Sequence, residues 1–344
     1  MIESRSSQVA ILYWGTRGGP IRQLSNLIET SVDEQLDIHW FLSDKIQGLT
    51  KLSEITENRM HVSRLPKSKI GLVFRILIRR KTANEAIKIM KLEGITRVFF
   101  LLPHPWDINL AKKIFKDSQI DVVRAVHDIN RHPGDIWPTK RAIRKTLKFA
   151  HRYVAFSSYI ATALKDYGKP VELTAIQETP VKVKTEMRDG SILFIGRIRK
   201  YKGLDLLRDA WNLLDHRGKK LTIAGSGSGI PFTEKSDLRI INSWLSDDEI
   251  NDLIDSHQVI VLPYVEASQS GIIPIAHAHG KPVVVTPVGG LINQVIPNVN
   301  GIIANEVSAK ALAIAIDSAL EKKWDIRSSN VELSRFLRFL VNYK

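Results

Sequence analysis

Residues 259–290 read VIVLPYVEASQSGIIPIAHAHGKPVVVTPVGG, and this stretch decides the fold. Val259–Leu262 and Val283–Thr286 are short, apolar, β-branched runs, which predict buried strands. Between them, Ile272–His279 predicts a helix that follows the small polar residues Ser268–Gly271. Strands that alternate with helices at this spacing form parallel sheets covered on both faces.

The same alternation runs along the whole chain and predicts an α/β protein with nine or more strands in two doubly wound parallel-sheet domains. The polar segment 177–190 contains a proline, lacks helical periodicity and predicts the boundary. We expect one domain over residues 1–176, a second over 177–325, and a last helix in 326–344 that crosses back to the first domain. The apolar face of that helix comprises Leu333, Phe336, Leu337, Leu340 and Val341. The remaining expected strands are Val9–Tyr13, Ile38–Leu42, Val98–Leu102, Val122–Val126, Tyr153–Phe156, Ile192–Ile195 and Leu221–Ala224.

The bulk composition excludes several classes of protein. A hydrophobic fraction of 44% over 344 residues excludes a disordered or collagen-like chain. The absence of cysteine excludes disulfides and thiolate metal sites and favours a cytoplasmic location. We expect no signal peptide, because the first apolar run is too short, and no membrane-spanning helix, because no apolar window reaches about 18 residues.

Positive charge is concentrated in the first half of the chain. The net charge is +14, and residues 1–180 hold 29 Lys and Arg against 18 Asp and Glu. This imbalance favours an anionic partner: nucleic acid, a phosphorylated substrate or anionic lipid. Two stretches, 139–152 and 70–81, predict basic helices that either lie on an anionic membrane or cover a core with a solvated face. Nucleic acid is disfavoured because aromatic residues do not alternate with these basic stretches.

The segment GRIRKYKG, residues 196–203, directly follows a predicted strand and carries a candidate anion site. Arg197 and Lys202 suit a diphosphate, although a solvated basic loop would have the same composition. The segment GTRGGP, residues 15–20, is also rich in glycine, but it does not match GxGxxG. A dinucleotide-dependent hydride transfer is therefore disfavoured.

Glu266 is a single carboxylate at the mouth of the strand in the opening stretch. The backbone N–H groups at the start of the following helix attract negative charge, and Gly271 allows a ligand to approach the backbone. The alternative is an ordinary capped helix beside an exposed glutamate. A ligand with hydroxyls at one end and phosphates at the other would satisfy both the acid and the amides.

Histidines follow two other predicted strands. The segment VHDINRHPGD, residues 126–135, contains His127, Asp128 and His132, and LPHPWD, residues 102–107, contains His104. A metal site is disfavoured because no further acids or cysteines accompany these residues. We interpret them as polar contacts to a substrate in the crevice between the domains.

Taken in order, these segments resemble the retaining glycosyltransferases of family 4, part of glycosyl transferases group 1, with the GT-B architecture of two Rossmann-like domains facing a central cleft. The resemblance is strongest over residues 191–301 and rests on GRIRKYKGLDLLRDAW, LTIAGSGSG, WLSDDEINDLIDSHQVIVLPYVEASQSG and AHAHGKPVVVTPVGGLINQVI. In the first half, the RGG loop and VHDINRHPG match less closely.

The resemblance implies a metal-independent, retaining hexosyltransferase that needs no cofactor besides its nucleoside diphosphate sugar. The acceptor would be a hydroxyl of a glycan or lipid-linked molecule in surface polysaccharide biosynthesis, with the enzyme cytoplasmic and peripheral on an anionic membrane. The alternative is a non-catalytic nucleotide-sugar or polyanion-binding protein on the same fold. An epimerase is disfavoured by the GRxxxxKG series.

The resemblance also assigns roles to individual residues. Catalytic contacts would come from His127 and Glu266, and base contacts from Ser243 and Leu245. The family's second glutamate has no counterpart, because Pro274 and Ile275 occupy its place. The residues implied at the donor diphosphate are Arg197, Lys202, Gly18, Gly19, Ser270, Gly271 and Ile272, and those implied on the acceptor side are Asp128, His132 and His104.

Overall fold

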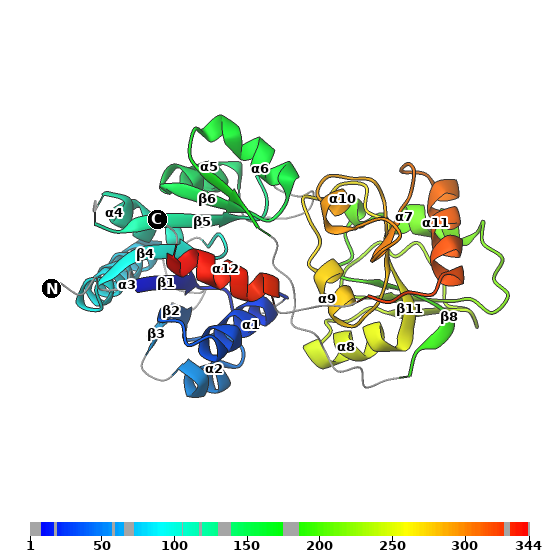
Figure 1. The fold of residues 1–344 in the computed structure, drawn as a ribbon, viewed down its shortest axis with the longest axis horizontal. Helices are drawn as coiled ribbons and strands as arrows, with labels where there is room; N and C mark the ends of the chain where they lie inside the picture. Colours follow the sequence, from blue (N-terminus) through cyan, green and yellow to red (C-terminus); the bar gives the residue numbers. More distant parts are fainter. Residues whose placement is uncertain are drawn as a thin grey trace.

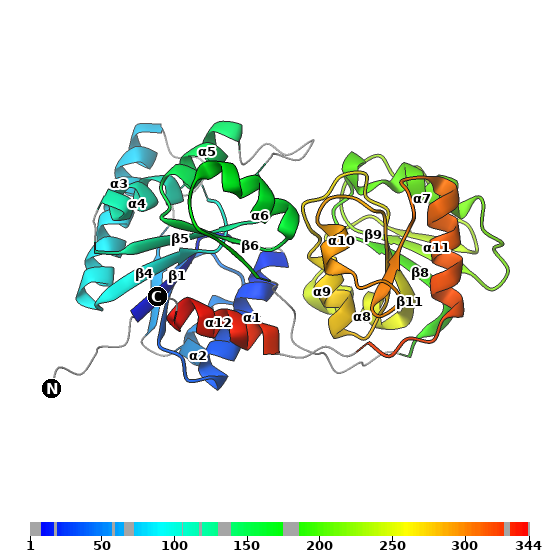
Figure 2. The same ribbon diagram turned by 45° about the horizontal axis from the view of Figure 1, so that its top comes forward.

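The computed structural model describes residues 8–16, 19–56, 59–64, 72–104, 106–116, 119–129, 139–174, 186–326 and 331–342. Within these residues the strands form two parallel sheets, each the centre of one lobe in Figures 1 and 2. The first sheet has the order β3-β2-β1-β4-β5-β6-β7 and the second the order β10-β9-β8-β11-β12-β13. The predicted α/β fold with two doubly wound domains is therefore confirmed.

The strand order reverses beside the first strand of each sheet, between β1 and β4 and between β8 and β11. Loops at the carboxyl ends of the strands diverge at such a point and leave a crevice. The strands are β1 (Gln8–Tyr13), β2 (Ile38–Ser43), β3 (Met60–Ser63), β4 (Ile95–Phe100), β5 (Asp121–Val126), β6 (Arg152–Ala155), β7 (Val171–Leu173), β8 (Arg188–Ile195), β9 (Lys220–Ala224), β10 (Leu238–Ile241), β11 (His257–Leu262), β12 (Val283–Val285) and β13 (Gly301–Ile303).

Helices cover both faces of each sheet. In the first lobe they are α1 (Gly19–Asp33), α2 (Leu49–Thr56), α3 (Leu72–Leu92), α4 (Asp107–Lys116), α5 (Lys140–Lys148) and α6 (Ser158–Leu164). In the second lobe they are α7 (Leu204–Trp211), α8 (Asp247–Ser256), α9 (Ile272–Ala278), α10 (Leu291–Gln294) and α11 (Ala309–Glu321). No helix in the described ranges combines the length and the apolar content needed to cross a membrane.

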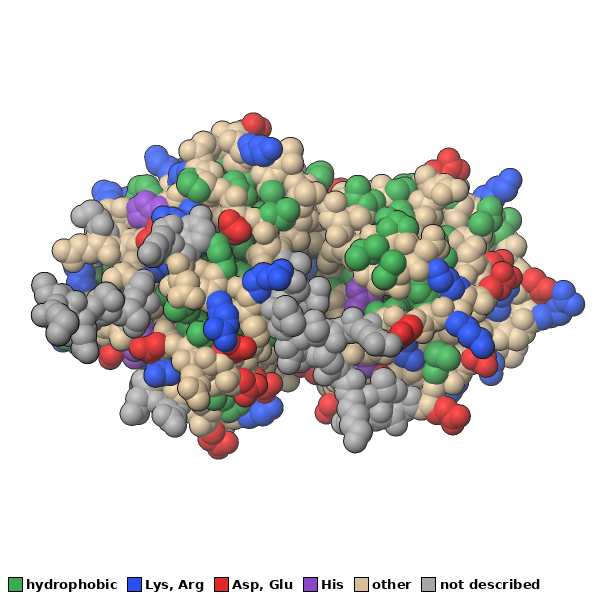
Figure 3. Space-filling model, in the orientation of Figure 1, with side chains coloured by type: hydrophobic (Ala, Val, Ile, Leu, Met, Phe, Trp, Pro, Cys, Tyr) green, Lys and Arg blue, Asp and Glu red, His purple; other side chains and the backbone are tan. Residues whose placement is uncertain are grey.

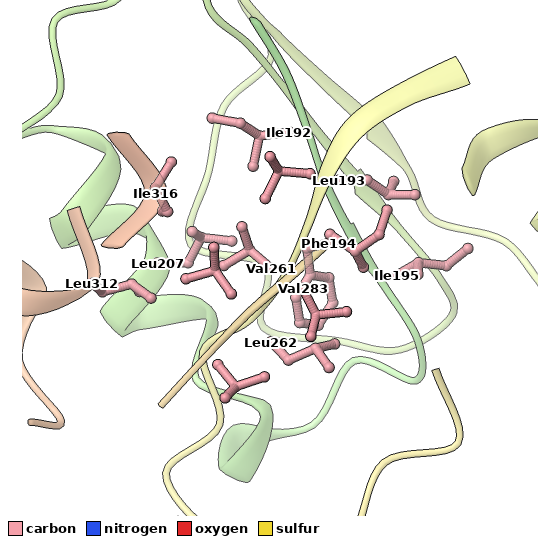
Figure 4. Packing of buried hydrophobic residues seen from close by; sticks show 14 of the residues in the cluster. Ile192, Leu193, Phe194, Ile195, Leu207, Val261, Leu262, Val283, Leu312 and Ile316 are labelled. Carbon is pink, nitrogen blue, oxygen red and sulfur yellow. The ribbon is translucent and has the colours of Figure 1, made fainter. Parts of the chain in front are cut away.

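The core of the second lobe explains why its strands are legible in the sequence. Phe194 of β8 and Val261 of β11 are fully buried, and Leu207 of α7 and Leu312 of α11 pack in the same cluster (Figure 4). A parallel strand covered by helices on both faces is apolar at almost every position. Central strands therefore appear in the sequence as continuous apolar runs.

The strands that the sequence did not predict all lie at the edges of the sheets. The strands β3, β7, β10 and β13 were not expected, and each forms one edge of its sheet. An edge strand has one neighbour and is partly exposed, as Val62 and Leu173 show. Their apolar content is correspondingly lower, so periodicity gives a weaker signal.

The last helix, α12 (Val331–Asn342), lies on the first lobe, although the second lobe precedes it in the chain (Figures 1 and 2). Its buried residues join the core that contains Phe99 of β4, and the Phe336 and Phe99 rings meet edge to face at 5.6 Å. The Arg97 side chain donates to the Leu340 carbonyl at 2.9 Å. The chain therefore passes twice between the lobes.

Candidate functional site

Three loops of the second lobe meet at the carboxyl ends of β8, β11 and β12. Gly203, at the end of the β8 loop, has φ 69°, and a Cβ there would lie 1.8 Å from the Pro263 carbonyl oxygen. The Val265 N–H donates to the Tyr201 carbonyl at 2.9 Å. These contacts hold the β8 loop against the β11 loop, so only glycine fits at position 203.

Lys202 and Ser270, which precedes α9, both contact the side chain of Tyr264. The Lys202 Nζ lies 3.6 Å from the centre of the Tyr264 ring, and the Tyr264 hydroxyl lies 3.2 Å from the Ser270 Oγ. Burial raises the pKa of Tyr264 to about 12, so the phenol stays neutral. Arg197, on the same β8 loop as Lys202, is exposed. A cation over an aromatic face is attracted by the ring quadrupole, which fixes the position of the lysine head group.

Both backbone groups of Ser270, which the resemblance places at the donor diphosphate, are engaged within the protein. The Ser270 N–H already donates to the Gln294 Oε1 at 2.7 Å, and the Gln294 Nε2 donates to the Ser270 carbonyl at 3.0 Å. Gly271 rather than a serine occupies the N-cap position of α9, and a Cβ on Gly271 would meet nothing within 4 Å. The open backbone at this helix start is therefore at Gly271.

Gln294 had no recognisable signal in the sequence, because an amide at the end of a short helix is common. Its two hydrogen bonds fix both backbone groups of Ser270. It therefore determines the shape of the loop that presents Gly271.

Glu266 is exposed and lies in the loop after β11, together with Tyr264 and Ser270. The positions expected to carry a second acid are apolar: Ile275 is buried in the core, and Pro274 is half-buried in the wall of an interdomain cavity. No second carboxylate replaces them on α9.

His127 joins the two lobes. Its Nε2 donates to the Leu101 carbonyl at 3.1 Å, and its Nδ1 accepts from the Gln269 Nε2 at 2.7 Å, a tautomer assigned from these partners. Burial lowers the pKa of His127, which favours this neutral form. Because both ring nitrogens are occupied, His127 is a neutral polar contact rather than a proton carrier in this conformation. The Gln269 contact was missed, since nothing in the sequence pairs residues 127 and 269.

The other predicted acceptor-side residues lie at the carboxyl edge of the first sheet. His104 packs edge-on against Trp14 with ring centres 6.3 Å apart, and burial together with the Arg79 charge lowers the pKa of His104 to about 4. Asp128 is half-buried directly after His127. His132 lies outside the described residues.

Of the other residues predicted on the donor side, those that the structure describes belong to the start of α1 and to the segment between β10 and α8. Gly18 lies outside the described residues, whereas Gly19 is the first residue of α1. Ser243 is exposed and Leu245 is half-buried, between β10 and α8. No three His, Cys, Asp or Glu side chains of the described ranges are arranged as ligands for a metal ion.

Among the residues that the structure describes, two further hydrogen bonds join the lobes besides that of Gln269 to His127. The Arg22 Nη1 donates to the Asn251 Oδ1 at 2.6 Å, and the Ser158 Oγ donates to the Asn293 Oδ1 at 2.7 Å. A cavity of about 360 Å³ lies between the lobes and is lined by residues of both. The predicted interdomain crevice is present, and its walls are held by these contacts.

Comparison with known proteins finds a family model that is similar to the second lobe. Residues 189–322 match the family model described as Glycosyl transferases group 1. A segment of 145 residues is 32% identical to an uncharacterized glycosyltransferase, MJ1607, of Methanocaldococcus jannaschii. That segment is 40% of this chain and spans only 37% of the relative.

The whole fold matches solved structures of low sequence identity. Alr3699/HepE of Anabaena, solved with UDP and glucose, is 14% identical, with 98% of this chain and 95% of that chain covered at a TM-score of 0.67. The lipopolysaccharide outer core galactosyltransferase WaaB is 18% identical, with 97% and 99% covered at a TM-score of 0.66. The predicted GT-B fold is confirmed, and so is the resemblance of the second lobe to glycosyl transferases group 1.

Proposed function

We propose that this chain transfers a sugar from a nucleoside diphosphate sugar to a hydroxyl of a glycan or lipid-linked acceptor, with retention at the anomeric carbon. The observation that carries the proposal is the convergence of Lys202 and the start of α9 on the Tyr264 ring. The group 1 match over residues 189–322 covers all of these residues. The UDP in the Anabaena structure supports a nucleotide donor by analogy.

The proposed chemistry places negative charge on the diphosphate as the bond to the sugar breaks. Lys202 and Arg197 would offset that charge together with the open N–H of Gly271 and the dipole of α9. These cations and the helix start would perform this role without a metal or another cofactor. The acceptor hydroxyl would attack on the face from which the diphosphate leaves, and the diphosphate oxygen would take the acceptor's proton.

The remaining residues would orient the two substrates. Glu266 would contact hydroxyls of the transferred sugar, and the neutral His127 would lie near the reacting carbon on the acceptor side. Gly19 would offer an amide near the distal phosphate. Ser243 and Leu245 would border the base. On the acceptor side we propose Asp128, His104 and His132.

The test is a panel of UDP-, GDP- and ADP-sugars with release of free nucleotide as the readout. Arg197→Ala and Lys202→Ala should each lower turnover and donor affinity, because each removes a charge-assisted contact to the diphosphate. Lys200→Ala is the matched control, since Lys200 is an exposed cation in the same turn. Turnover that is unchanged in both test variants would refute the diphosphate assignment.

A second candidate is a non-catalytic nucleotide-sugar-binding protein, which the apolar Pro274 and Ile275 favour. Donor binding in calorimetry without nucleotide release from any donor, over a panel of glycan acceptors, would establish this alternative. Release of nucleotide that depends on an added acceptor would exclude it.

The proposed membrane association rests on α5. This helix exposes four basic residues at helical spacing, Arg141, Arg144, Lys145 and Lys148. Ile143 and Leu147 of the same helix are buried. Elsewhere, blue and red side chains are intermingled over the face seen in Figure 3. Salt-sensitive co-sedimentation with anionic liposomes tests the association, and it should weaken in Arg144→Glu/Lys145→Glu. Equal sedimentation of this variant would count against α5.

A further inference from the structure

The interdomain cavity lies on the side of the β11 loop away from the cations. Lys202 and Arg197 follow β8, whereas the cavity is lined by α9, α10 and the chain after α10, which follow β11 and β12. The strand order β8-β11-β12 therefore places the loop that carries Glu266 between the cations and the cavity. Figures 1 and 2 show α9 and α10 on the side of the second lobe that faces the first.

The polar groups of the cavity wall are mostly amides. No lysine or arginine is found among the described residues that line it, and the acid is Asp325, which is exposed. Each amide offers an acceptor oxygen and two donor hydrogens, which complements hydroxyl groups rather than a charge. The amides come from Gln23 of the first lobe and from Gln269, Asn293, Gln294 and Asn300 of the second.

Some of these amides already form hydrogen bonds within the protein. Gln294 holds Ser270, the Gln269 Nε2 donates to His127, and the Asn300 Oδ1 accepts from the Ile296 N–H at 2.8 Å. The amide of Gln23 forms no hydrogen bond within the described part of the chain, and neither does the Gln269 Oε1. These two groups from opposite lobes are available to a ligand.

The rest of the wall is apolar. Phe156, Ile273 and Pro274 line the interior, and Ile296 and Val299 line the edge with 59% and 57% of their surfaces exposed. Pro274 stands where the resemblance expected a carboxylate, so the wall gains no negative charge there. Amides beside apolar surface suit a pyranose ring, which has hydroxyls at its edge and C–H groups on its faces.

We propose that this cavity binds an uncharged saccharide and is the acceptor subsite of the transfer reaction. This inference rests on the proposed function and names the chemical class of its acceptor. The cavity is also lined by His127 and Gly271, so a saccharide in it would reach the donor end of the crevice. Its volume of about 360 Å³ falls in the ~300–1,000 Å³ range of small-molecule sites.

Two variants test the cavity without touching the diphosphate residues. Val299→Trp narrows its mouth, and Val307→Trp is the matched control, because Val307 is 44% exposed in the loop before α11 and does not line the cavity. Gln23→Leu removes an unbonded amide while keeping its length. The probes are maltotriose, cellotriose, chitotriose and mannotriose, with trigalacturonate as the anionic counterpart. Binding is measured by saturation-transfer NMR and calorimetry, with and without UDP.

We expect at least one neutral trisaccharide to bind the wild type and to bind both variants about tenfold or more weakly. In Gln23→Leu the cause is the loss of one good hydrogen bond, and in Val299→Trp it is the steric block of the cavity mouth. Val307→Trp should bind as the wild type does, and UDP affinity should be unchanged in all variants. The inference is overturned if no neutral trisaccharide binds, if Val299→Trp binds it equally well, or if trigalacturonate binds more tightly. Failure of UDP, GDP and ADP alike to bind the wild type would instead refute the proposed donor, because saccharide binding is read separately.

Discussion

The two lobes each place a cation near an aromatic ring, and the cations differ in burial. In the first lobe Arg124 lies 4.5 Å from the Phe100 ring centre and is 1% exposed, 3.4 Å from the fully buried Asp107. In the second lobe Lys202 lies over Tyr264 at the edge of the crevice and is half-buried. The buried cation can only affect folding, whereas the cation at the crevice can bind an anion. Net charge alone does not separate these two roles.

The largest effect should follow from breaking the buried pair. Arg124→Met leaves Asp107 without its cation, which should cost about 3–5 kcal/mol of unfolding free energy at pH 8. Burial raises the pKa of Asp107 to about 6, despite the opposing charge of Arg124. Chemical denaturation of the variant and the wild type at several pH values measures the effect.

The free energy that Arg124→Met costs should depend on pH, because Asp107 titrates near pH 6 in the folded protein. The folded protein holds the Asp107 proton more tightly than the unfolded chain, so this group stabilises the fold most below about pH 4 and loses that contribution as pH rises to about 6. In Arg124→Met the pKa should rise further. The gap between variant and wild type should therefore widen above about pH 6, and a gap independent of pH would contradict the account.

The next effect concerns the cation at the crevice. Lys202→Met should leave the unfolding free energy nearly unchanged but lower kcat/KM by about 10²-fold, as for a group that stabilises developing charge. Lys200→Met should change neither. Loss of stability in Lys202→Met comparable to that of Arg124→Met would remove the distinction between the two cations.

A smaller loss of donor affinity should distinguish Gln294, which positions the loop at the crevice, from Gln258, which has a purely structural role. Gln294→Leu removes both hydrogen bonds to Ser270 and should weaken donor binding by roughly tenfold, as for about 1.4 kcal/mol. Gln258 also bonds two backbone groups, the Gly190 N–H and the Leu320 carbonyl, far from the crevice. Gln258→Leu should therefore lose stability without losing affinity, and equal affinity losses would show that Gln294 acts only through the fold.

The smallest effect is the pH response of His127. Its lowered pKa keeps the ring neutral above about pH 6.5, the ordinary value for histidine. Its stabilising contribution is present at neutral pH and is lost as pH falls below that value. We expect kcat/KM to be flat from pH 6.5 to 8, measured with the active donor. A histidine-like rise in that window which is absent from His127→Asn would show that the ring carries a proton.

Local sequence patterns predicted the central strands and the basic loop after β8, but they did not predict contacts between distant parts of the chain. Central strands such as the expected Val259–Leu262, and Lys202 in the basic loop after a strand, follow from patterns along one stretch of chain. The Gln269–His127 and Arg22–Asn251 contacts join residues 142 and 229 positions apart, which no local pattern records. The Asp107–Arg124 pair was also missed, because charged residues usually indicate exposed positions.

The most direct test of the central claim compares a nucleoside diphosphate with its nucleoside, using the base that the donor panel identifies. If Lys202 binds the diphosphate, wild-type protein should bind this nucleoside diphosphate at least tenfold more tightly than the nucleoside in calorimetry, and most of that difference should vanish in Lys202→Ala while nucleoside affinity stays unchanged. The same preference for the diphosphate in the wild type and in Lys202→Ala would contradict the account.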